Sequence, residues 1–241
     1  MVYNIYGGYI MNVVDFVIII LLVFGAIEGF KAGVIKKTTD FVGMFVIVVL
    51  AFSFKDKLST IMYENLPFFS FGGFIKGIDA INILLYEIIA FLIIFAFLLF
   101  LLKSLLVVTG LIEKILKATV ILSIPSKILG IFVGILESYV YIFIVLVVVT
   151  LPIFKADFIR ESKVAGFMLS DTPVLSSLSS EMIDIYGNVY NIVINRKDKS
   201  NEEVNTEITK FMIDKKVLSR ESAKKLVDRN KLHLSDNSIL E

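Results

Sequence analysis

Residues 128–154 read ILGIFVGILESYVYIFIVLVVVTLPIF, and this stretch decides the class of the fold. Glu137 is its only charged residue, and apolar residues do not alternate strictly with polar ones. A helix rises about 1.5 Å per residue, so about 20 residues cross the ~30 Å hydrocarbon core of a bilayer. Backbone polar groups find no water in that core and must bond within the protein, and the missing alternation of apolar and polar residues favours a helix over a barrel strand. The stretch therefore predicts a transmembrane helix.

Three earlier apolar runs predict three more spans, at residues 16–27, 41–54 and 88–102. The whole chain is 57% hydrophobic and 20% charged, against roughly 45–50% and 25% in an ordinary soluble domain. This composition excludes a disordered chain and a plain soluble enzyme. We predict an all-α integral membrane protein, in which residues 12–154 form a domain of four transmembrane helices in the lipid bilayer.

The residue inventory also narrows the chemistry. There is no cysteine, which excludes disulfides, thiolate catalysis and cysteine metal sites. The only histidine is His233, in a charged segment where a solvated side chain is expected. Hydrolase, zinc-protease and P-loop motifs are absent. We therefore predict no enzyme, no catalytic residue, no cofactor and no metal, and the net charge of +1 gives no reason to expect a nucleic-acid partner.

The N-terminus lacks the features of a secretory signal, because residues 1–12 contain no Lys or Arg and no cleavage-like site follows. Residues 1–11 are expected to be an extension, with Met11 as the initiator. The alternative is an interfacial aromatic segment. The two loops on one side of a four-span protein carry seven positive residues, against six on the other side. The positive-inside rule then puts both termini outside the cytoplasm.

Residues 155–241 predict a soluble helical tail. Apolar residues recur every three or four positions in residues 173–194, which is typical of an amphipathic helix. Residues 196–201 are a charged linker, and residues 202–234 predict a helical hairpin with Ser219 as an N-cap. Such a hairpin buries little by itself, so it is expected to dock on another surface. Two further segments, 66–71 and 111–124, are expected to lie at the membrane interface.

Glycines spaced four apart in the first and fourth spans predict a close helix–helix contact. They are Gly25, Gly29, Gly33, Gly130 and Gly134. The pattern favours packing of the first span against the fourth, with a homo-oligomer interface as the alternative.

Four ionisable residues lie in or beside the predicted spans: Asp15, Glu28, Glu87 and Glu137. Charges in hydrocarbon are costly and are therefore candidates for function. Asp15 and Glu87 are expected at headgroup level or paired with lysine. Glu28 and Glu137 each follow a glycine by three positions, so packing through these glycines predicts one site where both carboxylates share a proton or a cation.

A family resemblance rests on three sequence features and the four-span spacing. Asp15 opens the first span, GAIEGF closes it at residues 25–30, and PSKILGIFVGILE stands at residues 125–137. Over about residues 11–154 these features resemble the colicin V production protein family, called CvpA. The resemblance implies a bacterial inner-membrane protein with four spans, linked to toxin production. A similar module precedes extracytoplasmic serine protease domains, which implies a tail outside the cytoplasm.

The chain departs from the family pattern at two positions. Family members often carry Arg where Glu28 and Glu137 stand here, and the tail contains no protease domain. We predict a non-enzymatic role in envelope maintenance or in colicin V or toxin production. Two alternatives remain: a small channel or carrier that uses Glu28 and Glu137, and a scaffold that docks a protein partner through residues 155–241.

Overall fold

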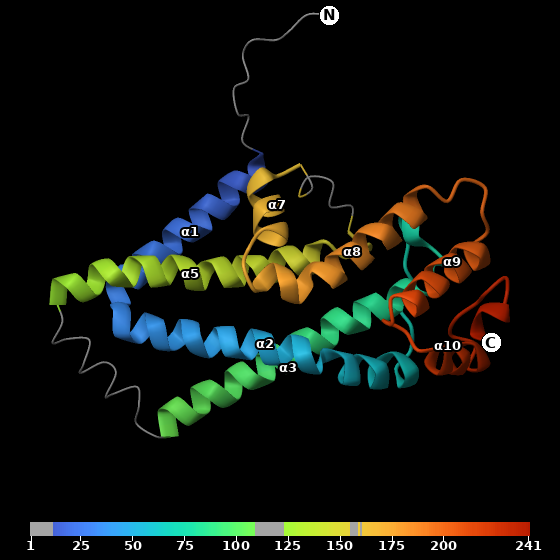
Figure 1. The fold of residues 1–241 in the computed structure, drawn as a ribbon, viewed down its shortest axis with the longest axis horizontal. Helices are drawn as coiled ribbons and strands as arrows, with labels where there is room; N and C mark the ends of the chain where they lie inside the picture. Colours follow the sequence, from blue (N-terminus) through green and yellow to red (C-terminus); the bar gives the residue numbers. More distant parts are fainter. Residues whose placement is uncertain (1–11, 109–122, 155–158, 160) are drawn as a thin grey trace, which may run out of the picture. The chain divides into compact units, whose positions relative to one another are not determined.

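The computed structural model describes residues 12–108, 123–154, 159 and 161–241, and within these residues it contains helices and turns but no strand (Figure 1). The predicted all-helical fold is therefore confirmed. The extension 1–11 and residues 111–122 of the second interfacial segment lie outside the described residues. The elements are α1 (Val13–Ala32), α2 (Val34–Asn65), η1 (Gly73–Ile75), α3 (Ile81–Val108), α5 (Ser123–Val149), α7 (Lys163–Ser170), α8 (Leu175–Ile194), α9 (Asn201–Asp214), α10 (Arg220–Asp228) and η2 (Ser238–Leu240).

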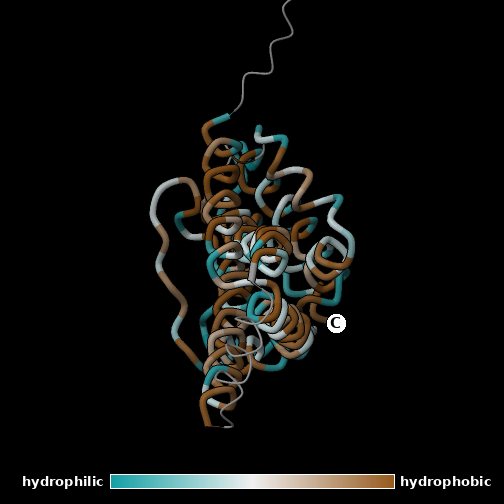
Figure 2. The backbone as a smooth tube through the Cα atoms, turned by 90° about the vertical axis from the view of Figure 1, so that its left-hand side faces the viewer, coloured by the Kyte–Doolittle hydropathy of each residue, from teal (hydrophilic) through white to brown (hydrophobic). Residues whose placement is uncertain are grey.

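Three of the described helices are long and apolar enough to cross a membrane: Val13–Ala32, Ile81–Val108 and Ile124–Val149. They contain the first and third predicted spans and residues 128–149 of the fourth, whose last five residues, 150–154, form turns. Figure 2 shows brown, hydrophobic residues along much of the backbone, together with white and teal stretches of more polar residues. Large apolar side chains are exposed along these helices, for example Phe97 and Phe100, as a lipid-facing surface requires. The predicted second span lies within α2, a helix of 32 residues with charged side chains at both ends.

The expectation of a loop between the first two predicted spans, over residues 28–40, is wrong. α1 ends at Ala32 and α2 begins at Val34, so Gly33 alone separates them. Gly33 has φ +78°, a conformation that L residues rarely adopt. Its N–H donates to the Gly29 carbonyl and its own carbonyl accepts from the Lys37 N–H. The hydrophobic run marks where lipid could lie, whereas helical hydrogen bonding continues beyond it into polar surroundings.

The chain divides into two compact units. The first comprises Met1–Phe41, Glu113–Leu146 and Ala156–Ser176, and the second comprises Val42–Ile112, Val147–Lys155 and Ser177–Glu241. α1 packs against α7 in the first unit, and the second unit contains α3 together with the tail helices α9 and α10. This division follows contacts, whereas the predicted division at residue 155 follows composition.

The helical tail forms the elements expected of it. α8 matches the predicted amphipathic helix within two residues, and α9 and α10 form the predicted hairpin. Ser219 caps α10 by accepting a hydrogen bond from the Ser222 N–H. The sequence reading missed α7, a helix of eight residues that Ser162 caps.

The hairpin docks on the chain itself, within the second unit. Its inner apolar residues are buried: Val204, Ile208, Met212, Ala223 and Leu226. The Asn205 side-chain oxygen accepts the Ala80 N–H at 3.2 Å, immediately before α3. The Ser222 hydroxyl donates to the Glu64 carboxylate at 2.8 Å, near the end of α2. The hairpin therefore covers the connection between α2 and α3, and a protein partner would have to use another surface of the tail.

Candidate functional site

The glycines of α1 and α5 lie against one another within the first unit. A Cβ atom added to Gly25 would lie 2.6 Å from the Gly134 carbonyl oxygen, and one added to Gly134 would lie 2.8 Å from the Gly29 Cα. A Cβ added to Gly29 would collide with the Gly130 carbonyl. Because the obstacles are backbone atoms, no side-chain rotation relieves them. We call Gly25, Gly29, Gly130 and Gly134 the glycine crossing.

The two candidate carboxylates beside the glycine crossing meet at one lysine. The Lys37 ammonium lies 2.5 Å from the Glu137 carboxylate and 3.4 Å from the Glu28 carboxylate. The side chains of Lys37 and Glu137 are 9% and 13% exposed, whereas that of Glu28 is 72% exposed. The cation that the two carboxylates share is therefore the Lys37 ammonium. We call Lys37, Glu28 and Glu137 the Lys37 triad. Lys37 lies between the predicted spans 16–27 and 41–54, where the apolar pattern gives no sign of a buried site.

Asp15 acts as a helix cap at the beginning of α1. Its carboxylate accepts from the Asn12 N–H at 3.1 Å and completes a capping box with Asn12. It also accepts the Ser162 hydroxyl and, at 3.1 Å, the Val164 N–H. Asp15 is 6% exposed, and these bonds satisfy a carboxylate that burial alone would disfavour. One side chain thus joins the start of α1 to the start of α7.

Glu87 lies in the second unit, and its partner is Lys55, in agreement with the expectation of a lysine pair. The Lys55 ammonium is 3.5 Å from the Glu87 carboxylate and 2.5 Å from that of Asp56. The side chains of Glu87 and Lys55 are 5% and 11% exposed. Phe91 lies one turn further along α3 and packs on Phe52, with ring centroids 4.6 Å apart. The Lys55–Glu87 ion pair therefore lies close to the packed rings of Phe52 and Phe91.

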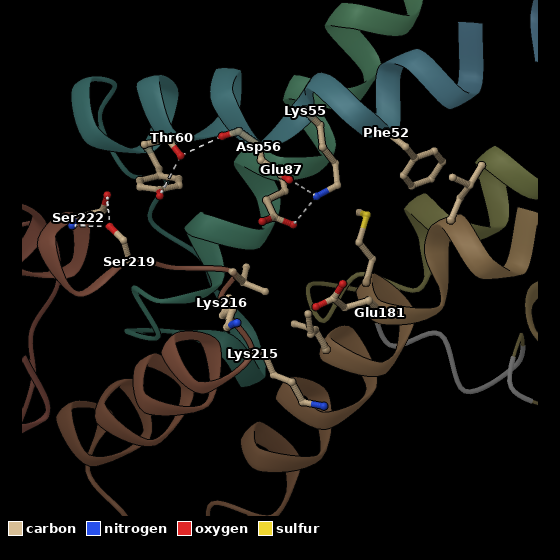
Figure 3. Close-up of a pocket in the computed structure, with 15 residues that line it drawn as sticks. Phe52, Lys55, Asp56, Thr60, Glu87, Glu181, Lys215, Lys216, Ser219 and Ser222 are labelled. Atoms are coloured by element: carbon tan, nitrogen blue, oxygen red, sulfur yellow. Dashed lines mark hydrogen bonds and ion pairs between the residues drawn. The ribbon is translucent and has the colours of Figure 1, made fainter. Parts of the chain in front are cut away.

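A cavity of about 520 Å³ opens beside the Lys55–Glu87 pair (Figure 3). Side chains of both charges line it: Lys55, Lys215, Lys216, Asp56, Glu87 and Glu181. In Figure 3 the Glu87 carboxylate points toward the Lys55 ammonium, and Glu181 approaches from α8. Hydroxyl groups of Thr60, Ser219 and Ser222 complete the polar lining. Such a lining suits water or a small ligand that carries both charges.

Tyr186 is a buried polar residue close to this cavity. It is fully buried on α8, and its hydroxyl has no hydrogen-bond partner among the described residues. Burial, together with the charge of Glu87, raises the pKa of the Tyr186 phenol well above its usual value. An unsatisfied buried hydroxyl costs free energy, so the Tyr186 hydroxyl lowers the stability of the folded chain.

The structure therefore adds three residues to the candidate list: Lys37, Lys55 and Tyr186. The lysine partners of Glu137 and Glu87 lie far away in the sequence, so no local sequence pattern predicts these ion pairs. Within the described ranges, no group of three or more His, Asp and Glu side chains is placed to hold a metal ion.

Long apolar helices, buried ion pairs and a glycine crossing define a helical integral membrane protein. The family described as "Colicin V production protein" matches residues 14–173. The chain belongs to this family, and the resemblance inferred from its motifs is confirmed.

A curated relative is similar over most of its length. It is "Uncharacterized transmembrane protein YshB" of Bacillus subtilis (strain 168), 29% identical over 182 residues, which cover 72% of this chain and 98% of the relative. No solved structure matches the chain.

Proposed function

We propose that this chain crosses the bacterial plasma membrane four times and acts without enzymatic chemistry in envelope maintenance or toxin production. The observation that carries the proposal is the family match over residues 14–173, in a chain with three apolar helices of membrane-spanning length. The description of the family supplies the link to toxin production, and the relative is a transmembrane protein by name.

Two contacts of the first unit support four crossings rather than three. The Asp15 carboxylate at the start of α1 accepts from Ser162, which follows α5, so both positions lie at the same face of the membrane. The Val34 N–H donates to the Ser126 hydroxyl at 3.2 Å, so the end of α1 and the start of α5 lie at the opposite face. An even number of crossings agrees with both contacts. If α1, α3 and α5 cross, α2 must cross as well.

The tail and the connection between α2 and α3 share one side in this arrangement, because the hairpin bonds directly to Glu64 and Ala80. We propose the extracytoplasmic side, on the positive-inside count and the protease precedent. The exposed linker residue Asp198 offers a labelling position, and the chain has no cysteine of its own. An Asp198→Cys variant should react with a membrane-impermeant maleimide on intact cells. Reaction only after lysis would contradict the orientation.

The biological role is tested by deleting the gene that encodes the chain and measuring detergent sensitivity and secreted toxin activity. We expect at least one defect, restored by the wild-type chain. A Gly29→Leu variant, which obstructs the glycine crossing, should fail to restore it, while Gly166→Ala, at a helical glycine with open space around it, should succeed. A deletion strain without either defect would refute the proposed role.

A transport role is the second candidate, because the Lys37 triad places three ionisable groups beside a helix crossing. The test is ion flux in liposomes that contain the full-length chain. The Glu28→Gln/Glu137→Gln double variant should reduce the flux if the triad takes part. Equal flux from liposomes with and without the chain would rule out this candidate.

A further inference from the structure

A second cavity of the second unit lies beside the aromatic segment that connects α2 to α3. Its volume is about 880 Å³, and Pro67, Phe68, Phe69, Ser70 and Phe71 form one wall. The opposite wall comes from the tail, and it includes Arg196 and Lys231. We call this cavity the Phe69 pocket. It is separate from the Lys37 triad and shares no lining residue with the cavity beside Glu87.

Positive charge exceeds negative charge in the Phe69 pocket. Lys76, Arg196 and Lys231 line it, with Asp79 as the only carboxylate in the lining. Asp79 is already engaged, because its carboxylate lies 2.7 Å from the His233 ring nitrogen and 3.4 Å from the Asn205 amide nitrogen. The residues that line the pocket therefore carry a net positive charge.

The three cationic side chains differ in the number of hydrogen bonds that they already make to the protein. Lys231 donates to the carbonyls of Tyr63 and Glu64 and lies 4.7 Å from the centre of the Phe68 ring. Its burial lowers the pKa of the Lys231 ammonium. Arg196 bonds only to the neutral Asn201 side chain, at 3.3 Å, and exposed Lys76 forms no ion pair among the described residues. Lys76 and Arg196 are therefore the groups available to an anion.

Side chains of α3 hold the backbone of the aromatic segment by hydrogen bonds. The Asn82 side chain accepts the Phe69 N–H at 2.7 Å and donates to the Phe69 carbonyl at 3.2 Å. The Tyr86 hydroxyl donates to the Pro67 carbonyl at 2.5 Å. These bonds fix the backbone, yet the Phe69 side chain remains 52% exposed. A fixed, exposed phenylalanine next to the start of a membrane-spanning helix is suited to acyl chains at the bilayer interface.

We propose that the Phe69 pocket binds one anionic phospholipid, with its phosphate between Lys76 and Arg196 and its acyl chains along Phe69. Basic side chains near a membrane surface attract anionic headgroups, and an apolar wall adds affinity that a soluble phosphate cannot use. Because the two walls come from the connection and the tail, the lipid joins the docked tail to the membrane. This inference goes beyond the proposed cellular role and does not depend on it.

Native mass spectrometry of the full-length protein in detergent tests the proposal, with phosphatidylglycerol, phosphatidylcholine and sn-glycerol 3-phosphate as probes. We expect tightest binding for phosphatidylglycerol and weakening by about tenfold or more in Lys76→Gln/Arg196→Gln. The charge-matched control is Lys210→Gln/Lys224→Gln, at exposed tail positions outside the lining, and it should stay within about twofold of wild type. Phe69→Ser should weaken the lipid and leave glycerol phosphate unchanged.

Three results would overturn the site. Equal loss in both double variants would indicate a diffuse charge effect. Equal affinity for the two lipids would remove the role of the anion. Binding of glycerol phosphate as tight as that of phosphatidylglycerol would identify a site for free phosphate instead of a lipid.

Discussion

The ammonium group of Lys37 lies 2.5 Å from the carboxylate of Glu137, although 100 positions separate the two residues in the chain. Both side chains are nearly buried, and Glu28 adds a second, more exposed carboxylate at 3.4 Å. A buried ion pair is costly to break, because removal of one partner leaves the other charge without compensation. Because Glu137 is nearly buried and Glu28 is exposed, removal of the two carboxylates should change the stability of the protein by different amounts.

Glu137→Gln should destabilise the protein more than Glu28→Gln. The first change leaves a buried ammonium with only the longer contact, at a cost of about 3–5 kcal/mol. The second removes an exposed partner, at a cost of about 0–1 kcal/mol. Thermal unfolding in detergent, followed by circular dichroism, measures the difference. A larger effect from Glu28→Gln would show that the triad is arranged differently.

Gly29→Ala should lower the unfolding temperature, because the new Cβ would collide with the backbone carbonyl of Gly130. Overpacking of this kind costs about 1–3 kcal/mol. Gly166→Ala is the matched control, since nothing lies within 4 Å of the Cβ position of that helical glycine. The control should be neutral or stabilise the protein by up to about 1 kcal/mol. Equal behaviour of the two variants would mean that the glycine crossing is looser than described.

Ser222 and Glu64 should be energetically coupled, because the Ser222 hydroxyl donates to the Glu64 carboxylate at 2.8 Å. Ser222→Ala is expected to weaken docking of the hairpin by about 1–2 kcal/mol. A double-mutant cycle with Glu64→Gln, read by hydrogen exchange of α10 amides, isolates the pair. Ser180→Ala, at an exposed position of α8, serves as the control. A coupling energy near zero would show that the Ser222 hydroxyl and the Glu64 carboxylate do not interact.

Tyr186 predicts a loss of stability at alkaline pH. Its pKa is raised in the folded state by burial, whereas the phenol of an unfolded chain ionises near pH ~10. Above that pH the unfolded state binds fewer protons than the folded state, so the free energy of unfolding falls as pH rises. The slope contributed by one such group reaches about 1.4 kcal/mol per pH unit.

Tyr186→Phe should remove this slope between about pH 10 and 11.5, and at pH 7 the variant should be at least as stable as the wild type. The reason is that the hydroxyl has no hydrogen-bond partner within the described part of the chain. Urea unfolding of the full-length protein in detergent at both pH values gives the comparison. Destabilisation of the variant at pH 7 by more than about 1 kcal/mol would reveal a hidden partner for the hydroxyl.

The helices of the tail could be read from the sequence because their determinants are local. An apolar residue every three or four positions marks α8, and Ser219 marks the start of α10. The short helix α7 escaped because eight residues display barely two turns of any pattern. Helix ends escaped for another reason, since Lys36 and Lys57 are charged but remain helical within α2.

The candidate sites divide in the same way. Glu28, Glu87 and Glu137 stand out because a carboxylate within an apolar run is conspicuous. Their lysine partners do not stand out, because Lys37 and Lys55 flank apolar runs, and lysines are common at such positions. Only the tertiary structure brings Lys55 to Glu87, 32 positions away.

The single-residue connection at Gly33 has a consequence for biosynthesis. With no polypeptide between α1 and α2 other than this glycine, neither helix can be inserted, tagged or lengthened at their junction without disturbing the other. During synthesis, the first residues of α2 therefore follow the end of α1 after a single glycine. A nascent chain that stalls between Gly33 and Lys37 would contain Glu28 of α1 without the ammonium group that lies 3.4 Å from it in the folded protein.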